Sequence, residues 1–163
     1  MALSLTPFQQ RWRRSLRSIG REFSPLLQNT GKELESRYAE PHRRYHAASH
    51  ILQCLQEFEE IQSFAEHPRE LELAIFFHDA IYNTHATDNE EQSARLAWQA
   101  GQNMNLPQEA LERIVRLIEG TKIGRMPQTE DERLMEDIDY SILGQPQEVY
   151  HRYGEGVRFE YSW

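Results

Sequence analysis

Histidine and aspartate, two residue types that bind metal ions, occur here in two tight pairs, His46 with His50 and His78 with Asp79. The second pair lies within the most apolar run of the chain, Leu71-Glu-Leu-Ala-Ile-Phe-Phe-His-Asp-Ala-Ile-Tyr82. An imidazole and a carboxylate in apolar surroundings are costly unless they have partners, and a metal ion would supply one. The histidines of the first pair are four residues apart, so on a helix both rings lie on one face.

A further carboxylate is expected from residues 136–144. Asp137 and Asp139 face nearly opposite ways on a helix. Asp139 shares its face with Met135 and Ile142, which predicts that it points toward the core. Helical phase therefore favours Asp139 and leaves Asp137 as the alternative.

Imidazoles combined with carboxylates form a mixed nitrogen and oxygen site. Such a site suits Mn, Fe, Co, Ni or Zn better than calcium or a thiolate-binding metal, with Mg as a further candidate. A divalent ion with open positions lowers the pKa of bound water and polarises a phosphoryl oxygen. The predicted chemistry is hydrolysis of a phosphate ester or anhydride by metal-activated water.

The elements that must position these residues are all predicted to be helices. Thr6 and Ser24, each followed by proline, are typical N-caps, and Thr129 with Glu132 fits a capping box. Helical spacing of apolar residues covers eight segments: 6–20, 24–40, 43–65, 69–82, 89 to beyond 100, 107–120, 129–144 and 146 onward. We expect an all-α, single-domain bundle of about eight helices over residues 1–163. Its N-terminal helices (6–40) would pack on a metal-binding core (43–144), followed by a C-terminal helix (146–163).

Composition and charge narrow the class of protein. The chain has 163 residues, of which 39% are hydrophobic and 27% charged, as in ordinary soluble domains. Its net charge of −8 argues against a nucleic-acid polymer or an anionic membrane as partner. Cys54 is the single cysteine, which excludes an internal disulfide and suggests a reducing compartment. With no signal or membrane-spanning run, we expect a cytoplasmic protein.

In chain order, His50, His78-Asp79 and Asp139 resemble the HD superfamily of metal-dependent phosphohydrolases. The resemblance is to a bacterial branch of predicted HD phosphohydrolases and extends from about Phe8 to the end. Four segments carry it: Glu40-Pro-His-Arg-Arg-Tyr-His-Ala-Ala-Ser-His-Ile51, Phe76-Phe-His-Asp-Ala-Ile-Tyr82, Asp88-Asn-Glu-Glu-Gln-Ser-Ala94 and Asp137-Ile-Asp-Tyr-Ser-Ile-Leu-Gly144. It implies an HD-domain-like fold in which His50, His78, Asp79 and Asp139 bind the metal.

The resemblance also implies roles for neighbouring residues. His46 lies where related phosphodiesterases place a histidine that acts as general acid toward the leaving oxygen. A protonated His46 beside a dication would need a carboxylate to hold its charge. Glu90 and Glu91 are candidates to orient water or a ligand histidine. The first candidates for phosphate contacts are Arg43 and Lys122.

The chain departs from the branch at two places. Residues 123–125 read Ile-Gly-Arg where the branch often has a histidine, which argues against a second metal and for one ion per chain. Related chains continue past a segment like Arg158-Phe-Glu-Tyr161, whereas this chain stops at Trp163. We therefore expect a truncated C-terminal helix and an apolar surface that either stays uncovered or is covered by the second subunit of a homodimer.

Two other functions stay open beside the phosphohydrolase. One is a non-catalytic module that binds metal and nucleotide for regulation. The other is a structural metal site, which needs four closed ligands and no accessible water. The enzyme would act on a small phosphorylated molecule, with a nucleotide as one candidate.

Overall fold

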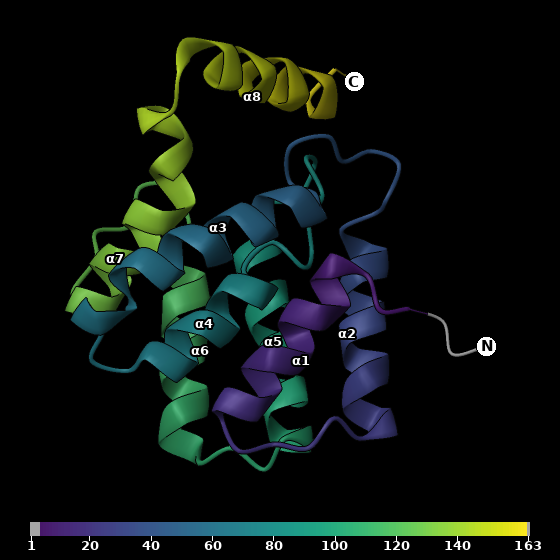
Figure 1. Ribbon diagram of the computed structural model, residues 1–163. Helices are drawn as coiled ribbons and strands as arrows, with labels where there is room; N and C mark the ends of the chain where they lie inside the picture. The colour runs from purple at the N-terminus through teal and green to yellow at the C-terminus, as the bar shows by residue number, and fades with distance from the viewer. Residues whose placement is uncertain (1–3, 163) are drawn as a thin grey trace.

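The computed structural model describes residues 4–162, and within them the chain forms eight α-helices, two short 3₁₀ helices and no strand (Figure 1). This confirms the predicted all-α bundle. The C-terminal helix was expected to reach Trp163, which lies outside the described residues. In order, the elements are α1 (Pro7–Ser18), α2 (Pro25–Arg37), α3 (Ala48–Ile61), η1 (Gln62–Phe64), α4 (Pro68–Phe77), α5 (Asn89–Asn103), α6 (Gln108–Gly120), α7 (Glu130–Asp139), η2 (Tyr140–Gly144) and α8 (Gln147–Glu160).

Local side-chain caps begin three of these helices where the sequence predicts. The hydroxyls of Thr6, Ser24 and Thr129 each accept a hydrogen bond from the backbone N–H three residues later. The capping box at Thr129 is only half formed. The carboxylate of Glu132 accepts from the backbone N–H of Gln128, at 2.7 Å, instead of from that of Thr129.

Helix α4 is the buried centre of the bundle. Every residue from Leu71 to Phe77 is buried, and α4 packs against α1, α3, α5, α6 and α7. The ring of Trp12 in α1 lies edge-on to Phe76 and Phe77, with centroids 5.1 and 6.1 Å away. Because α4 is enclosed by packed neighbours, its C-terminal end is held in a fixed place.

Helices α1 and α2 pack closely at Gly31. A Cβ atom added to this glycine would lie 2.3 Å from Cδ1 of Trp12. The indole Nε1 of Trp12 also donates to the backbone carbonyl of Leu27 in α2, at 2.7 Å. The indole therefore fills the space between α1, α2 and α4, and only glycine at position 31 leaves room for it.

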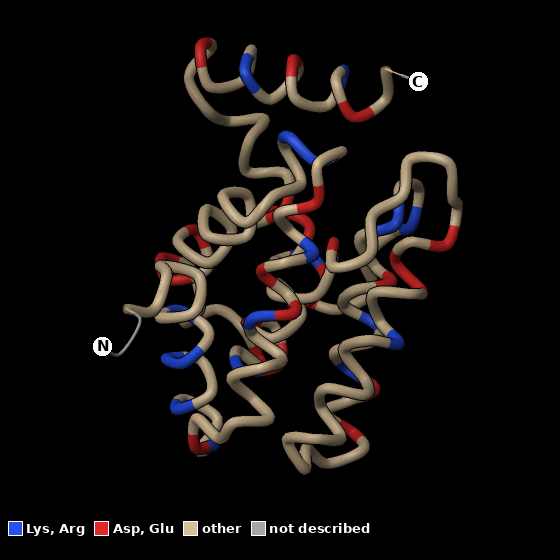
Figure 2. Tube along the Cα trace, turned by 90° about the vertical axis from the view of Figure 1, so that its right-hand side faces the viewer, with Lys and Arg blue, Asp and Glu red and all other residues tan. Residues whose placement is uncertain are grey.

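Helix α8 stands apart from the bundle, above α3 in Figure 1, and carries residues of both charges along its length (Figure 2). Glu160 is the one described residue of this helix that is fully buried. At Gly156 an added Cβ would lie 3.2 Å from Cβ of Tyr45. The last two turns of α8 therefore lie directly against the loop before α3.

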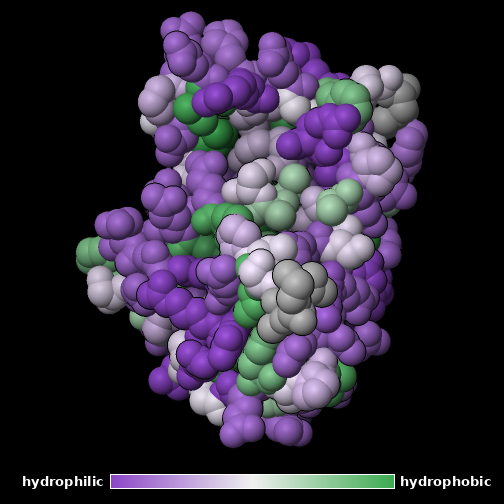
Figure 3. All heavy atoms as spheres, turned by 45° about the vertical axis from the view of Figure 1, so that its right-hand side comes forward, coloured by the Kyte–Doolittle hydropathy of each residue, from purple (hydrophilic) through white to green (hydrophobic). Residues whose placement is uncertain are grey.

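The face shown in Figure 3 is largely hydrophilic, with smaller apolar areas between the charged side chains. None of the helices in residues 4–162 combines the length and apolar character needed to cross a membrane.

Three predicted helix boundaries are wrong, and all three lie near the ligand residues. The segment 43–47 forms turns, so α3 begins only at Ala48. Helix α4 ends at Phe77, before the predicted end at residue 82. The predicted helix 129–144 is divided into α7 and η2, with Asp139 as the last residue of α7.

Candidate metal centre

The side chains of His50, His78, Asp79 and Asp139 meet at one point. Each offers a ligand atom, and these four atoms all lie within 4.8 Å of one another. The Nε2 atoms of His50 and His78 are 3.3 Å apart. Oδ1 of Asp139 lies 3.1 Å from Nε2 of His50, and Oδ2 of Asp79 lies 3.2 Å from Nε2 of His78. This group could hold a metal ion.

Three packed helices place these ligand residues. His50 lies in the first turn of α3, His78 and Asp79 directly follow α4, and Asp139 ends α7. The helices α3, α4 and α7 contact one another pairwise, which brings the three positions together. Asp137, the alternative to Asp139, is exposed and lies outside the cluster, as helical phase predicts.

The orientation of His78 suits metal binding. Its Nδ1 lies 2.9 Å from the backbone carbonyl of Ile75, which can only accept a hydrogen bond. Nδ1 therefore carries a proton, and Nε2 is the nitrogen that faces the cluster and could give its lone pair to a metal ion in exchange for a proton. The backbone at the end of α4 thus selects the tautomer that a metal requires.

The charges of the cluster favour a cation. Burial raises the pKa of the Asp79 and Asp139 carboxyls, but the neighbouring histidines lower it further, so both lie well below the usual range. Burial lowers the pKa of His78, whereas Asp79 and Asp139 raise it to a net value well above the usual one. Two ionised carboxylates thus share a largely enclosed space with the two imidazoles, and a bound cation would compensate them.

Cys54 lies next to the cluster. Its Sγ is 3.6 Å from Nδ1 of His50, one turn earlier on α3. Burial and the nearby carboxylate of Asp139 raise the pKa of this thiol well above its usual value. Cys54 is therefore a protonated packing residue.

Arg43 does not have the predicted role of phosphate contact. Its side chain is 0% exposed, and its Nε pairs with the carboxylate of Glu40 at 3.0 Å. Its terminal nitrogens donate to the backbone carbonyls of Asp79 at 2.7 Å, Ala80 at 3.1 Å and His46 at 3.0 Å. The guanidinium is thus engaged by Glu40 and by three backbone carbonyls, and two of these contacts hold the turn after α4 that carries Asp79.

His46 lies beside the cluster, but it is placed there by the loop before α3 and not by the helix itself. It precedes α3, so the prediction that it shares a helical face with His50 is wrong. Its ring centroid is nevertheless 5.9 Å from that of His50, and it stacks on Tyr82 at 4.2 Å. Nδ1 of His46 lies 2.7 Å from Oε2 of Glu160.

Glu160 is the site residue that the sequence analysis missed. Its Oε1 accepts hydrogen bonds from the backbone N–H groups of residues 44, 45 and 46 at 2.6, 2.8 and 3.0 Å. Its Oε2 contacts His46 and accepts from the hydroxyl of Tyr82 at 3.2 Å. Burial raises the pKa of Glu160, but His46 and the hydrogen bonds from the backbone N–H groups bring it down to about 2. The sequence offered one signal for Glu160, which is that a protonated His46 needs a carboxylate nearby.

The other predicted residues lie outside the four-residue cluster. Glu90 and Glu91 are in the first turn of α5. Nζ of Lys122 donates to the carboxylate of Glu91 at 2.6 Å and to the backbone carbonyl of Thr87 at 2.7 Å. This ion pair connects the loop after α6 to the start of α5.

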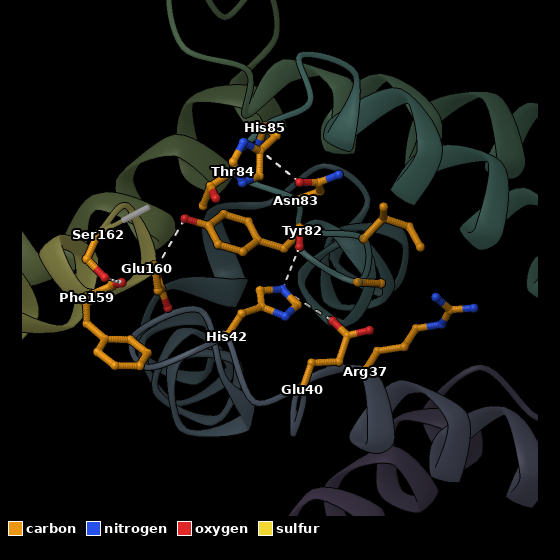
Figure 4. Close-up of a pocket in the computed structure, with 12 residues that line it drawn as sticks. Arg37, Glu40, His42, Tyr82, Asn83, Thr84, His85, Phe159, Glu160 and Ser162 are labelled. Atoms are coloured by element: carbon orange, nitrogen blue, oxygen red, sulfur yellow. Dashed lines mark hydrogen bonds and ion pairs between the residues drawn. The ribbon is translucent and has the colours of Figure 1, made fainter.

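Two cavities border the region. The larger, about 660 Å³, lies between the end of α2, the loop after α4 and the end of α8 (Figure 4). There His42 lies between Glu40 and Tyr82, with Nε2 2.8 Å from the Tyr82 carbonyl oxygen. None of the four cluster residues lines this cavity. A second cavity of about 450 Å³ lies beneath α8 and is lined by His50.

No family model, curated protein or solved structure matches this chain. The candidate centre is therefore defined by its own geometry. Two imidazole nitrogens and two carboxylate oxygens converge, and a third imidazole with its own carboxylate lies beside them.

Proposed function

We propose that this protein is a metal-dependent phosphohydrolase of the HD superfamily that its sequence resembles. The observation that carries the proposal is the convergence of four ligand atoms, from His50, His78, Asp79 and Asp139, within 4.8 Å of one another. This donor set suits one divalent ion of Mn, Fe, Co, Ni or Zn, with Mg as a further candidate. The proposed substrate is a small phosphorylated molecule, with a nucleotide as one candidate.

The bound ion would lower the pKa of a water molecule and polarise a phosphoryl oxygen. Arg43 donates to the backbone carbonyls of Asp79 and Ala80 and so positions Asp79, one of the residues that would hold the ion. His78 presents Nε2 because its Nδ1–H donates a hydrogen bond to the backbone carbonyl of Ile75. These contacts fix the ligands before substrate binds, so little reorganisation is needed during the reaction.

His46 is the proposed general acid toward the leaving oxygen. Its Nδ1 is held by Glu160, so a second proton can reside on Nε2. Burial lowers the pKa of His46, but Asp79 and Glu160 raise it to a net value above the usual one. These carboxylates thus favour the protonated ring, and Glu160 holds its charge.

Elemental analysis coupled to a hydrolysis assay tests the proposal. We expect one divalent ion per chain, and hydrolysis of phosphomonoesters, phosphodiesters or nucleotides in the presence of Mn²⁺, Co²⁺ or Ni²⁺. The variant Asp79→Ala should lose both the ion and the activity. If the metal-loaded wild type hydrolyses no substrate of the panel, the proposed enzymatic activity is refuted.

The same assay separates the two alternatives. A regulatory module would bind metal and give a thermal shift with a nucleotide but form no product. A structural site should be closed to water. The side chains of Asp79 and Asp139 are 20% and 18% exposed, which fits an accessible site better than a closed one.

A further inference from the structure

The cavity beneath α8 reaches the candidate metal centre. It measures about 450 Å³, lies between the start of α8 and the beginning of α3, and is lined by His50. Small-molecule sites commonly measure about 300–1,000 Å³. We call this cavity the α8 cleft. Because a ligand residue lines it, a molecule bound there is next to the cluster.

The α8 cleft is positively charged within an acidic chain. Two of its lining residues are Arg44 and Arg152, and none of the described lining residues is acidic. The guanidinium of Arg44 lies 4.1 Å from the ring centroid of Phe159, which fixes its position. Arg152 is exposed, and within residues 4–162 it forms no hydrogen bond or ion pair. A guanidinium free to donate in this way matches the geometry of a phosphate group.

Aromatic rings connect the cleft to the cluster. The ring centroid of Tyr45 lies 4.7 Å from that of His50 and 4.5 Å from that of Tyr153. The two tyrosine rings meet edge to face, at 77°. Ile142 and Val149 add apolar surface to the same walls. Such walls suit a flat ring, which gains from stacking or edge contacts with aromatic side chains.

The roof of the cleft is fixed by the last turns of α8. Gly156 lies against Tyr45, and Glu160 accepts the backbone N–H groups of residues 44–46. Arg152 and Tyr153 lie one turn before Gly156 on the same helix. Their distance from the cluster is therefore set by the contacts that hold α8 in place.

We propose that the α8 cleft is the substrate-binding site and that Arg152, assisted by Arg44, binds a phosphate group of the substrate. Tyr45 and Tyr153 contact a flat ring, so the substrate class is a phosphate ester that carries an aromatic group, such as a nucleoside phosphate. The reaction assigned to this site rests on the proposed function. The binding assignment does not, because it follows from the charge and shape of the cleft.

A probe that cannot be hydrolysed tests the cleft separately from the reaction. We choose the phosphonate analogue of adenosine 5′-monophosphate, in which a methylene group replaces the ester oxygen, and titrate it calorimetrically into the full chain loaded with Mn²⁺. Loss of a charged hydrogen bond in Arg152→Gln should weaken binding by about tenfold or more. The matched control is Arg158→Gln, an exposed arginine of the same helix outside the cleft, which should bind like wild type. Equal affinities for both variants would overturn the proposal.

The aromatic contact has its own test. The corresponding phosphonate of ribose lacks the adenine ring, so wild type should bind it more weakly than the adenosine probe. In Tyr153→Leu this preference should largely disappear, whereas an unchanged preference would overturn the aromatic assignment. A wild type that binds the probe but hydrolyses no phosphate ester would refute the proposed function and leave the cleft supported. If Arg152→Gln hydrolyses nucleotides with an unchanged KM, the α8 cleft is not the substrate-binding site, while the proposed function stands.

Discussion

The carboxylate of Glu160 lies 2.7 Å from Nδ1 of His46, although 114 positions separate the two residues in the chain. The same carboxylate accepts three backbone N–H groups of the loop that carries His46. One side chain of α8 therefore orders the loop and balances the charge of its histidine. The last helix is part of the candidate site as well as its cover.

Replacing Glu160 by glutamine should destabilise the fold in a pH-dependent manner. The pKa of Glu160 is lowered from an ordinary 4.5 to about 2, so its charge stabilises the folded state above pH 4.5. That contribution is lost as the pH falls through about 2. At pH 7 we expect Glu160→Gln to lower the free energy of unfolding by about 1–3 kcal/mol. Urea unfolding at pH 7 and pH 3 should show a smaller difference at the lower pH.

Glu155→Gln is the matched control for this experiment. Glu155 is an exposed residue of the same helix, so its change should leave the free energy of unfolding nearly unaltered at both pH values. A difference between Glu160→Gln and wild type that stays constant from pH 7 to pH 3 would show that the charge of Glu160 is not what stabilises the fold.

Asp139→Asn should abolish stable metal binding, while Asp137→Asn should not. Only Asp139 of this pair belongs to the cluster, and Asp137 is exposed on the same helix. We expect Asp139→Asn to weaken the binding of Mn²⁺ or Zn²⁺ by more than the roughly 10–100-fold typical for loss of an outer partner. Elemental analysis after dialysis measures this. Equal metal content in the two variants would remove Asp139 from the ligand set.

Arg43→Lys should weaken metal binding although it changes none of the four residues that would bind the metal. A lysine keeps the charge, but its single ammonium cannot replace a fork that contacts Glu40 and three backbone carbonyls, among them that of Asp79. The expected loss of metal affinity is about 10–100-fold, measured by calorimetry. Arg133→Lys, at an exposed pair with Glu130, is the control. Wild-type metal affinity in a destabilised Arg43→Lys would mean that Arg43 serves the fold alone.

Gly31→Ala should cost about 1–3 kcal/mol of unfolding free energy, because the new methyl group would overlap the indole of Trp12. Gly144→Ala is the comparison, since an added Cβ at that position meets nothing within 4 Å. Urea unfolding at neutral pH measures both variants. If the two substitutions have the same effect, the close contact between α1 and α2 is not limiting.

The helical architecture was predictable because its signals are local. Thr6, Ser24 and Thr129 cap helices through hydroxyl groups three residues from their partners, and these caps are visible in the sequence. The inward phase of Asp139 was likewise a property of its own helix. Each of these predictions needed only the spacing of residues within one segment.

The errors arise where distant residues compete for the backbone. The segment 43–47 is compatible with a helix, but Glu160 accepts hydrogen bonds from the backbone N–H groups of residues 44–46 and holds the segment in turns. The apolar run continues after Phe77, but Arg43 takes the carbonyls of Asp79 and Ala80. Both partners are side chains from elsewhere in the chain. No pattern within either segment reports them, so both helices were predicted too long.

The way α8 is attached links two events that could otherwise be independent. Two contacts attach this helix: Gly156 lies against Tyr45, and Glu160 binds the backbone of the loop before α3. If α8 detaches, His46 loses its carboxylate and the α8 cleft loses its roof at the same moment. Docking of the last helix, pairing of His46 with its carboxylate and closure of the α8 cleft are thus a single equilibrium. A ligand held in the cleft must therefore slow amide hydrogen exchange at residues 44–46, because their N–H groups are held by Glu160 and become exposed only when α8 detaches.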